Sequence, residues 1–360
     1  MSALWFFSGH VSAQATSEVN RSMDQVSDIS EDEKLGFTNG SFIVVPVPFS
    51  NPTIGSGLAL GGGYLFRDDA ESDTSVIGIG ALRSDNGSEA YGVIANFAFN
   101  RNEWIIESFF GQADMSYDLF LGQFPVPIRQ EGDLARFKLA YGITPRLSFG
   151  TTLRYLNTLI SSDGPGVLPP QFVPDADLEL MNFGLTTDWD TRDDGDYPTE
   201  GLRLDIDLIY GEEIDDDGRG YGKAFVLLDG YRSFGPRSVL AARGALCAAS
   251  TDAPFFDLCS LGGTDAFRGF SSAQFLNQRL LSGQIERRQR LNDRWGIVAF
   301  GGIGWTGDTL DSLTKGGSHS AIGAGLRYRV SKKFPVDFSV DVSHNNEGDE
   351  NLYISVGQRF

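Results

Sequence analysis

Apolar and polar side chains alternate along the last residues of the chain. Leu352, Ile354, Val356 and Phe360 form one set of positions, while Tyr353, Ser355, Gly357 and Arg359 form the other. Side chains in a β-strand point to opposite faces with a period of two, so the segment predicts a strand with one apolar and one polar face. Strands of outer-membrane barrels have this pattern, and the terminal aromatic residue is typical of the last strand.

The same alternation recurs upstream, with turn residues between the repeats. It is clear in residues 137–141, 202–210, 322–330 and 336–342. An ordinary antiparallel sheet with one solvated face also alternates. Strands of about ten residues, short turns alternating with long loops, and small residues on the polar face favour a membrane barrel. Closing the barrel also satisfies the backbone groups of every strand within lipid. We therefore predict an all-β, transmembrane antiparallel β-barrel over residues 40–360.

The residues before this barrel predict export. Residues 1–15 contain a short apolar run and end in Ala13-Gln-Ala15, the small-x-small pattern of a signal peptidase site. A basic start is missing, so the signal peptide is either truncated or weak. Residues 16–39 are rich in Ser, Asp and Glu and predict a disordered periplasmic leader. The expected location is the outer membrane, crossed many times.

The net charge of the chain limits the kinds of partner that it is expected to bind. The formal net charge of −19 argues against nucleic acid, whose phosphates require a basic surface. The acidic stretch from Glu212 to Asp217 would suit divalent cations bridged to lipopolysaccharide phosphates, although such loops are usually only solvated. A calcium loop starting at Glu213 would need a Glu where Ala224 stands, so we expect no metal site. Outer-membrane lipid and lipopolysaccharide are the expected partners.

The chain has two cysteines, Cys247 and Cys259. An even number in an exported chain predicts a disulfide, which would stabilise the fold by about 2–4 kcal/mol. Two unpaired, buried thiols are the alternative.

A glycine-rich loop follows Cys259. Gly262, Gly263 and Gly269 allow the chain to bend tightly, and they surround Arg268, which stands between Phe267 and Phe270. This segment resembles the Arg-Gly-Phe signature of the bacterial surface antigen superfamily, the outer-membrane barrels that include protein assembly and secretion proteins. Residues 188–201 resemble the periplasmic turn of that family, and Phe360 matches its insertion signal.

The resemblance implies sixteen strands and a loop that folds into the lumen between the eleventh and twelfth strands. Five strands are expected after the loop, starting near Gln278, Arg294, Ser320, Val336 and Leu352. Ten are expected before it, starting near Ser56, Thr74, Glu89, Glu103, Leu134, Arg146, Leu178, Leu202, Tyr221 and Ser238. The eleventh is either Phe42 to Pro48 or a second half of Glu103 to Gly122.

Two departures from the family pattern bear on function. The leader is too short for the periplasmic domains of the assembly and secretion proteins, so the resemblance implies the subgroup without them. Relatives also place an acidic partner for the loop arginine in an Asp-x-Gly pattern, where this chain has Gly302. Glu286 matches the other acidic position, so we predict that Arg268 pairs with Glu286, shielded by Phe267 and Phe270.

The resemblance implies a non-enzymatic barrel that assists insertion or transport of protein or lipid. The barrel assembly machinery would recognise Phe360 during insertion of this chain.

A passive or gated channel is the alternative, with the loop as its constriction. Its lumen would have mixed charge and be lined by Arg136, Lys138, Arg154, Arg203, Asp205, Asp207, Arg327, Arg329, Asp337 and Asp341. The alternative is that these charged residues have no transport role and only brace the inside of a filled barrel. With three histidines and no Gly-x-Ser-x-Gly motif, we expect neither catalysis nor a cofactor.

Overall fold

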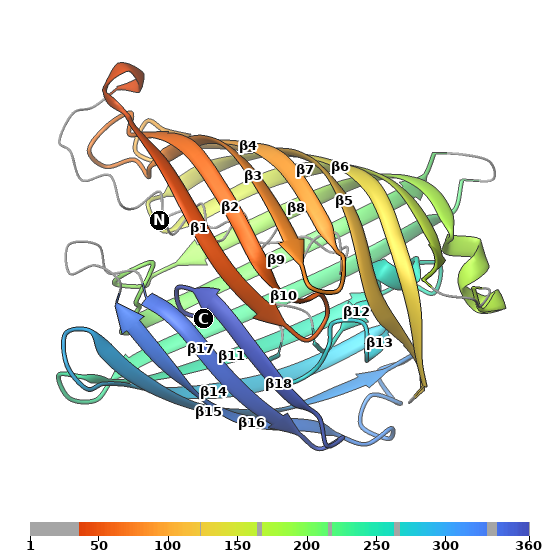
Figure 1. Ribbon diagram of the computed structural model, residues 1–360. Helices are drawn as coiled ribbons and strands as arrows, with labels where there is room; N and C mark the ends of the chain where they lie inside the picture. Colours follow the sequence, from red (N-terminus) through yellow and green to blue (C-terminus); the bar gives the residue numbers. More distant parts are fainter. Residues whose placement is uncertain are drawn as a thin grey trace.

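A closed antiparallel β-barrel makes up the protein (Figure 1). The computed structural model describes residues 36–122, 124–163, 168–214, 218–262, 267–329 and 337–359. Within them, every barrel strand pairs with its neighbours in sequence, and β1 closes the sheet against β18. The predicted sixteen-stranded barrel is therefore confirmed.

Eleven barrel strands precede the loop that carries Arg268, and five follow it. The first group is β1 (Ser41–Asn51), β2 (Gly55–Phe66), β3 (Ser75–Ser84), β4 (Glu89–Phe99), β5 (Trp104–Leu121), β6 (Phe124–Thr144), β7 (Leu147–Ser162), β8 (Asp177–Asp190), β9 (Glu200–Glu213), β10 (Gly220–Ser233) and β11 (Ser238–Ala249). The second is β14 (Arg279–Arg290), β15 (Trp295–Gly307), β16 (His319–Arg329), β17 (Asp337–Asn345) and β18 (Glu350–Val356).

Small elements complete the described part of the chain. They are the 3-10 helices η1 (Phe37–Asn39), η2 (Pro170–Asp175) and η3 (Phe255–Asp257), and the short strands β12 (Cys259–Ser260) and β13 (Leu276–Asn277), which pair with each other. None of the helices in the described segments has the length and apolarity to cross a membrane.

The strand predictions were correct in number but not at every boundary. The segment from Phe42 to Pro48 is a strand, β1, while residues 104–121 form the single strand β5, which settles the open alternative. The strand expected near Leu134 begins ten residues earlier, at Phe124. This first part contains Pro125 and Pro127, and β6 pairs with β5 from Phe124 to Tyr141 in a tall hairpin. The expected signal peptide, Phe360, Gly263 and the leader up to residue 35 lie outside the described residues.

The two ends of the barrel differ. The longest connections, residues 163–176, 250–278 and 308–318, share one end, which we call the loop end. The opposite end, which we call the turn end, holds the start of β1 and short turns such as residues 145–146 and 234–237. In outer-membrane barrels the short turns face the periplasm and the long loops face outward, which gives this barrel its orientation.

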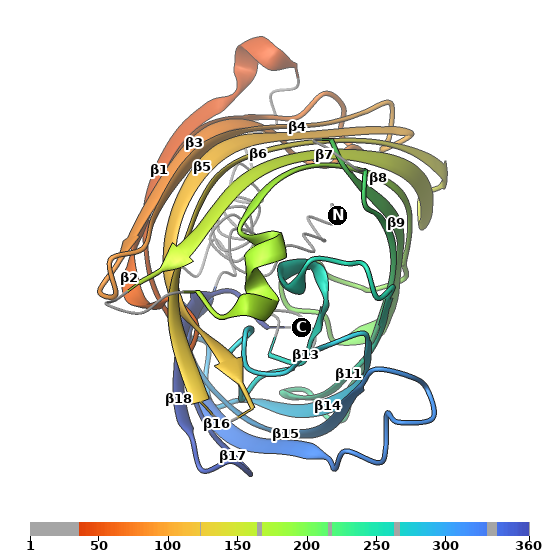
Figure 2. The same ribbon diagram turned by 90° about the vertical axis from the view of Figure 1, so that its right-hand side faces the viewer.

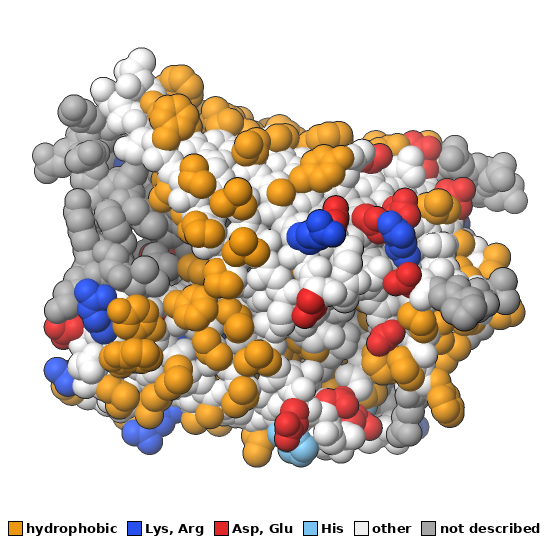
Figure 3. Space-filling model, viewed as in Figure 1, with side chains coloured by type: hydrophobic (Ala, Val, Ile, Leu, Met, Phe, Trp, Pro, Cys, Tyr) orange, Lys and Arg blue, Asp and Glu red, His pale blue; other side chains and the backbone are white. Residues whose placement is uncertain are grey.

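Alternation sends apolar side chains outward and polar ones into the lumen. On β17, Asp337, Ser339 and Asp341 are buried inside the barrel, whereas Val342 is 56 % exposed on the outer wall. Figure 3 shows hydrophobic side chains spread over the outer wall on β1 to β4 and on β16 to β18. Of the charged residues predicted to line the lumen, Arg329 is half-buried and the others are buried.

Candidate functional site in the barrel lumen

The connection between β11 and β14, residues 250–278, folds into the barrel. Its described parts, residues 250–262 and 267–278, are called the lumen loop below. η3 lies inside the ring of strands when the barrel is viewed from the loop end (Figure 2). The pairing of β12 with β13 draws the two arms of the loop together. A disulfide between Cys247 on β11 and Cys259 on β12, with Cα atoms 5.7 Å apart, fixes the first arm to the barrel wall.

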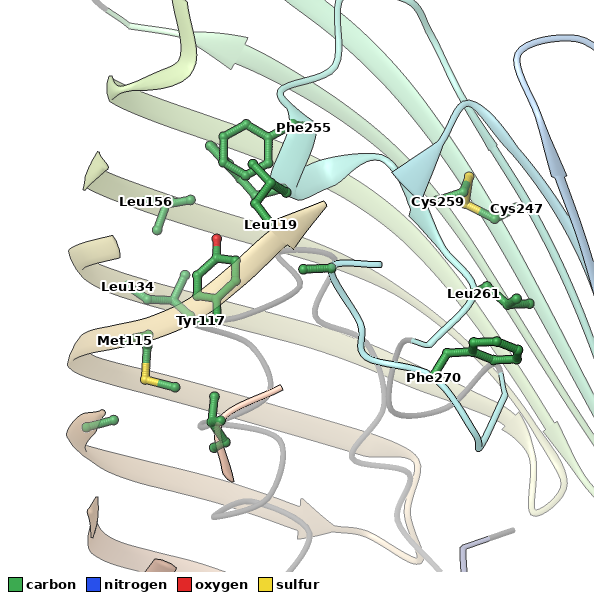
Figure 4. Packing of buried hydrophobic residues seen from close by; sticks show 14 of the residues in the cluster. Met115, Tyr117, Leu119, Leu134, Leu156, Cys247, Phe255, Cys259, Leu261 and Phe270 are labelled. Carbon is green, nitrogen blue, oxygen red and sulfur yellow. A yellow bond between two sulfur atoms is a disulfide. The ribbon is translucent and has the colours of Figure 1, made fainter. Parts of the chain in front are cut away.

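Apolar packing holds the part of the lumen loop that lies near the extracellular end. Met115, Tyr117 and Leu119 on β5 point into the lumen and belong to the same buried cluster as Phe255 and Leu261 of the loop (Figure 4). Met115 and Leu261 are completely buried. The barrel interior therefore contains a hydrophobic core, to which the lumen loop contributes.

Arg268 reaches the centre of a buried polar network beneath this core. Its Nη2 donates to Oε2 of Glu286 at 2.6 Å, and its Nη1 donates to Oδ2 of Asp341 at 2.9 Å. Nε donates to Oε1 of Gln284 at 3.0 Å, and the guanidinium lies 3.7 Å from the ring centroid of Phe300. Arg268 is 4 % exposed and Glu286 is fully buried. A guanidinium and carboxylates this close in a buried position form strong, charge-assisted bonds.

Two further arginines share the same carboxylates. Nε of Arg288 donates to Oε1 of Glu286 at 2.8 Å, and Arg327 donates from both terminal nitrogens to Asp341. Both arginines are almost completely buried. The network thus joins the loop to β14, β16 and β17, so that several strands of the C-terminal half are cross-braced through Arg268.

Backbone geometry at the loop tip explains two of the glycines. Gly269 has φ of +126°, and a Cβ there would lie 2.3 Å from Cβ of Ala321 on β16. A Cβ on Gly262 would lie 2.2 Å from the carbonyl oxygen of Ser271. A larger residue at Gly269 would push the loop tip away from the wall, and one at Gly262 would push the two arms of the loop apart.

The loop tip also contacts both sides of the junction between β1 and β18. The amide of Gly269 donates to the hydroxyl of Tyr353 on β18 at 2.8 Å, and its carbonyl accepts from Nδ2 of Asn351 at 2.8 Å. On the other side, the amide of Ser272 donates to Oγ1 of Thr53, between β1 and β2, at 3.0 Å. The loop therefore bridges the first and last strands of the barrel.

A second network lies at the extracellular end of the barrel. Asp257 of η3 accepts hydrogen bonds from Arg154 and Tyr221 on the wall. Asp175 of η2 accepts from the amide of Phe255 at 2.9 Å and from Nη2 of Arg219 at 2.8 Å. η2 lies at the loop end of the barrel in Figure 1 and next to η3 within the outline of the strands in Figure 2, and these bonds connect the two helices to each other and to the wall.

The structure brings most of the residues predicted for this site together. Arg268 contacts Glu286, Phe267 and Phe270 are buried beside it with ring centroids 5.9 Å apart, and the two cysteines are joined. Gly302, where the family resemblance implied an acidic residue, leaves space that the ring of Phe267 fills: a Cβ there would lie 2.5 Å from Cε2 of Phe267.

Sequence reasoning missed Asp341, Gln284 and Tyr353 as partners of the loop tip. Asp341 had been placed on the lumen face by its period, but the sequence does not show which lumen residues face each other across the barrel. The signal that could have suggested it is charge: Arg327, on the neighbouring strand opposite Ser339, and Arg268 both require a carboxylate in a closed lumen.

The closed barrel with an arginine loop locked in its lumen defines the class, an outer-membrane barrel with an inward-folded loop. Residues 91–360 match the model of the Omp85 superfamily domain, and the chain belongs to this superfamily. It is the family that the Arg-Gly-Phe motif resembles. The chain is therefore an outer-membrane barrel of the assembly and translocation class. A search of curated proteins finds no match.

Solved structures share the fold at low sequence identity. BamA from Haemophilus ducreyi lacking POTRA domains 1–3 is 11 % identical with a TM-score of 0.62, covering 89 % of this chain and 70 % of that chain. CdiB from Escherichia coli is 13 % identical with a TM-score of 0.63, covering 95 % and 70 %. CdiB from Acinetobacter baumannii is 11 % identical with a TM-score of 0.60, covering 88 % and 59 %. At these identities the likeness concerns the fold.

Proposed function

We propose that this barrel assists the insertion or translocation of protein or lipid at the outer membrane, and that it acts through the junction of β1 and β18. In the described residues, β1 and β18 pair only at Ser50 and Ile354. By comparison, β17 pairs with β18 from Phe338 to His344, and β1 pairs with β2 along its whole length. The single observation that carries the proposal is this short pairing, because the junction with the fewest backbone hydrogen bonds opens at the lowest cost.

The sequence of β1 supports the same conclusion. Pro46 and Pro48 have no N–H to donate, and proline within a sheet is typical of edge strands. An edge strand offers its unpaired backbone groups to an incoming strand, which is the physical basis of strand addition. A strand of a newly made outer-membrane protein would pair with the edge of β1 in this way.

The lumen loop would control the junction. Its tip binds Tyr353 and Asn351 on one side and Thr53 on the other, so the loop in this position holds the two edges near each other. Release of Arg268 from Glu286 and Asp341 would free the tip and permit the edges to part. The loop position and the state of the junction would then be coupled.

The alternative, a passive channel, has less support. Arg268 of the lumen loop is fixed to the wall inside the barrel by bonds of 2.6 Å to Glu286 and 2.9 Å to Asp341, so the loop lies in the path that a channel would need. We also assign the chain no enzymatic role. His319 lies 3.7 Å from Glu347 at the extracellular end, and His344 is exposed on the outer wall, away from the lumen network.

A reversible cross-link across the junction tests the proposal. Ser50→Cys with Ile354→Cys places two thiols at the paired positions. The barrel, reconstituted in lipid vesicles, is offered an unfolded model outer-membrane barrel, and insertion is followed by protease protection. The oxidised variant should lose its acceleration of insertion, and reductant should restore it. The matched control is Ser339→Cys with Ser355→Cys, across the fully paired β17 and β18, which should keep full activity oxidised or reduced. Full activity of the oxidised junction variant would refute the proposal.

A further inference from the structure

The outer wall carries an apolar groove of about 530 Å³ across β8 to β11 and β14. Its floor is formed by small residues, Gly222, Ala224 and Ala248. One wall consists of large exposed side chains: Phe183, Leu185, Leu208 and Tyr210. A Cβ on Gly222 would meet no atom within 4 Å, so the space above the floor is open. Its volume lies in the range of small-ligand sites, about 300–1,000 Å³.

Strand register places the positively charged side chain of Arg279 on the side of this groove opposite the large apolar side chains. Leu208 pairs with Ala224, Ala224 with Ala248, and Ala248 with Arg279, so these residues form one row across the wall. Side chains paired across strands lie on the same face of a sheet. The row therefore runs from the bulky Leu208, over the small Ala224 and Ala248, to the guanidinium of Arg279.

The position of Arg279 along its strand corresponds to the outer headgroup level. Leu281 and Ile285 follow it on the lipid-facing side of β14, and the next outward position after Ile285 is Arg287. Arg279 and Arg287 are about 27 Å apart along the strand, or about 19 Å along the membrane normal at a tilt of about 45°. This separation is somewhat less than the apolar band of such barrels, which is about 25 Å tall, so each arginine lies near one edge of the band. Arg279, at the loop end, faces the outer leaflet.

The described part of the wall does not neutralise the charge of Arg279. Nη1 donates to the carbonyl oxygens of Ala249 and Gln278, at 2.6 and 2.8 Å, which orients the guanidinium. Among the described residues, no carboxylate forms an ion pair with it. The outward Glu212 on β9 is four residues beyond Leu208, about 14 Å along the strand at about 3.4 Å per residue, and so lies outside the row that ends in Arg279.

We propose that this groove binds one acyl chain of a phosphorylated outer-leaflet lipid, lipopolysaccharide, with a lipid A phosphate on Arg279. Lipid tails are as apolar as the groove, so the groove alone would not select one lipid from the bulk membrane. The oriented guanidinium supplies the selection, because it forms charge-assisted hydrogen bonds with phosphate. The small floor lets the chain approach the sheet closely beneath the phosphate.

Native mass spectrometry of the refolded, full-length barrel in detergent tests this site, with lipid A, dephosphorylated lipid A and phosphatidylethanolamine as probes. We expect one lipid A per barrel, retained in preference to the other two lipids. Arg279→Gln should weaken retention about tenfold, which corresponds to about 1.4 kcal/mol. Ala224→Phe with Ala248→Phe, which fills the groove, should weaken it similarly. Arg287→Gln, on the same outward face at the turn end, is the matched control and should bind like the unchanged barrel. Heat-modifiable migration establishes that each variant is folded.

Several results would overturn the site. Equal retention of the three lipids would mean that the groove holds only bulk lipid. Equal losses in Arg279→Gln and Arg287→Gln would mean that binding depends on total charge. A dimer that disappears when the groove is filled would identify a second barrel as the occupant instead of lipid. If Arg279→Gln does not fold, retention by the groove-filled variant at the unchanged level would by itself refute the proposal.

Discussion

Arg268 and Asp341 are 73 residues apart in sequence, yet Nη1 of the arginine donates to Oδ2 of the aspartate at 2.9 Å inside the barrel. With the bond from Arg268 to Glu286, this contact makes one guanidinium a bridge between β14 and β17. Since all three side chains are at most 4 % exposed, any one of them left without its partners would be a buried, uncompensated charge.

The first prediction is that these three residues act as a coupled unit. Arg268→Ala, Glu286→Ala and Asp341→Ala should each lower the free energy of unfolding by about 3–5 kcal/mol. Double variants that combine Arg268→Ala with either carboxylate variant should lose clearly less than the sum. The free energy is measured by urea titration of the folded band in vesicles. Arg83→Ala, in an exposed pair with Glu89, is the control and should cost about 0–1 kcal/mol. Strictly additive losses would show that Arg268 is not locked by these carboxylates.

The second prediction concerns the tip glycine. Gly269→Ala should destabilise the barrel by about 1–2 kcal/mol for the backbone conformation and by a further 1–3 kcal/mol, roughly, for the clash with Ala321. Gly87→Ala is the matched control: Gly87 also has a positive φ, but its Cβ would meet nothing within 4 Å, so only the backbone cost should appear. Equal costs at the two positions would mean that the tip does not pack closely against β16.

The third prediction is that Cys247 and Cys259 are oxidised in the protein recovered from membranes. Their disulfide closes a loop of twelve residues in the structure, so its removal should cost about 2–4 kcal/mol. Intact mass after alkylation without reductant should show no labelled cysteine. Two labels would instead mean that the first arm of the lumen loop is held by packing alone.

The fourth prediction is that deletion of Phe360 impairs assembly of this chain. The terminal aromatic residue is expected to anchor the last strand at the membrane interface and to be recognised during insertion. The yield of heat-modifiable barrel in membranes is the measurement, with deletion of the exposed, unrelated Leu310 in a loop as control. An unchanged yield of folded barrel would contradict it.

Period-two alternation located most of the strands and the faces of their residues, because lipid and lumen impose opposite chemistry on neighbouring positions, while the number sixteen came from the family resemblance. It failed for the first part of β6, from Phe124, which rises past the membrane in a hairpin with β5 and carries prolines. The pairing of Arg268 with Glu286 was predictable from the motif, since the loop and β14 are adjacent in sequence. The contact between Arg268 and Asp341 was not predictable, because contacts across the lumen depend on barrel curvature and on the depth of the loop. A single sequence shows neither.

We propose that the locked loop closes the lumen, so that the barrel works through its wall instead of its pore. Conductance of the purified, refolded barrel in a planar bilayer tests this most directly. The unchanged protein should be nearly silent, and Arg268→Ala should show frequent openings as the loop leaves its position. A steady, large conductance from the unchanged barrel would contradict the claim and favour a channel.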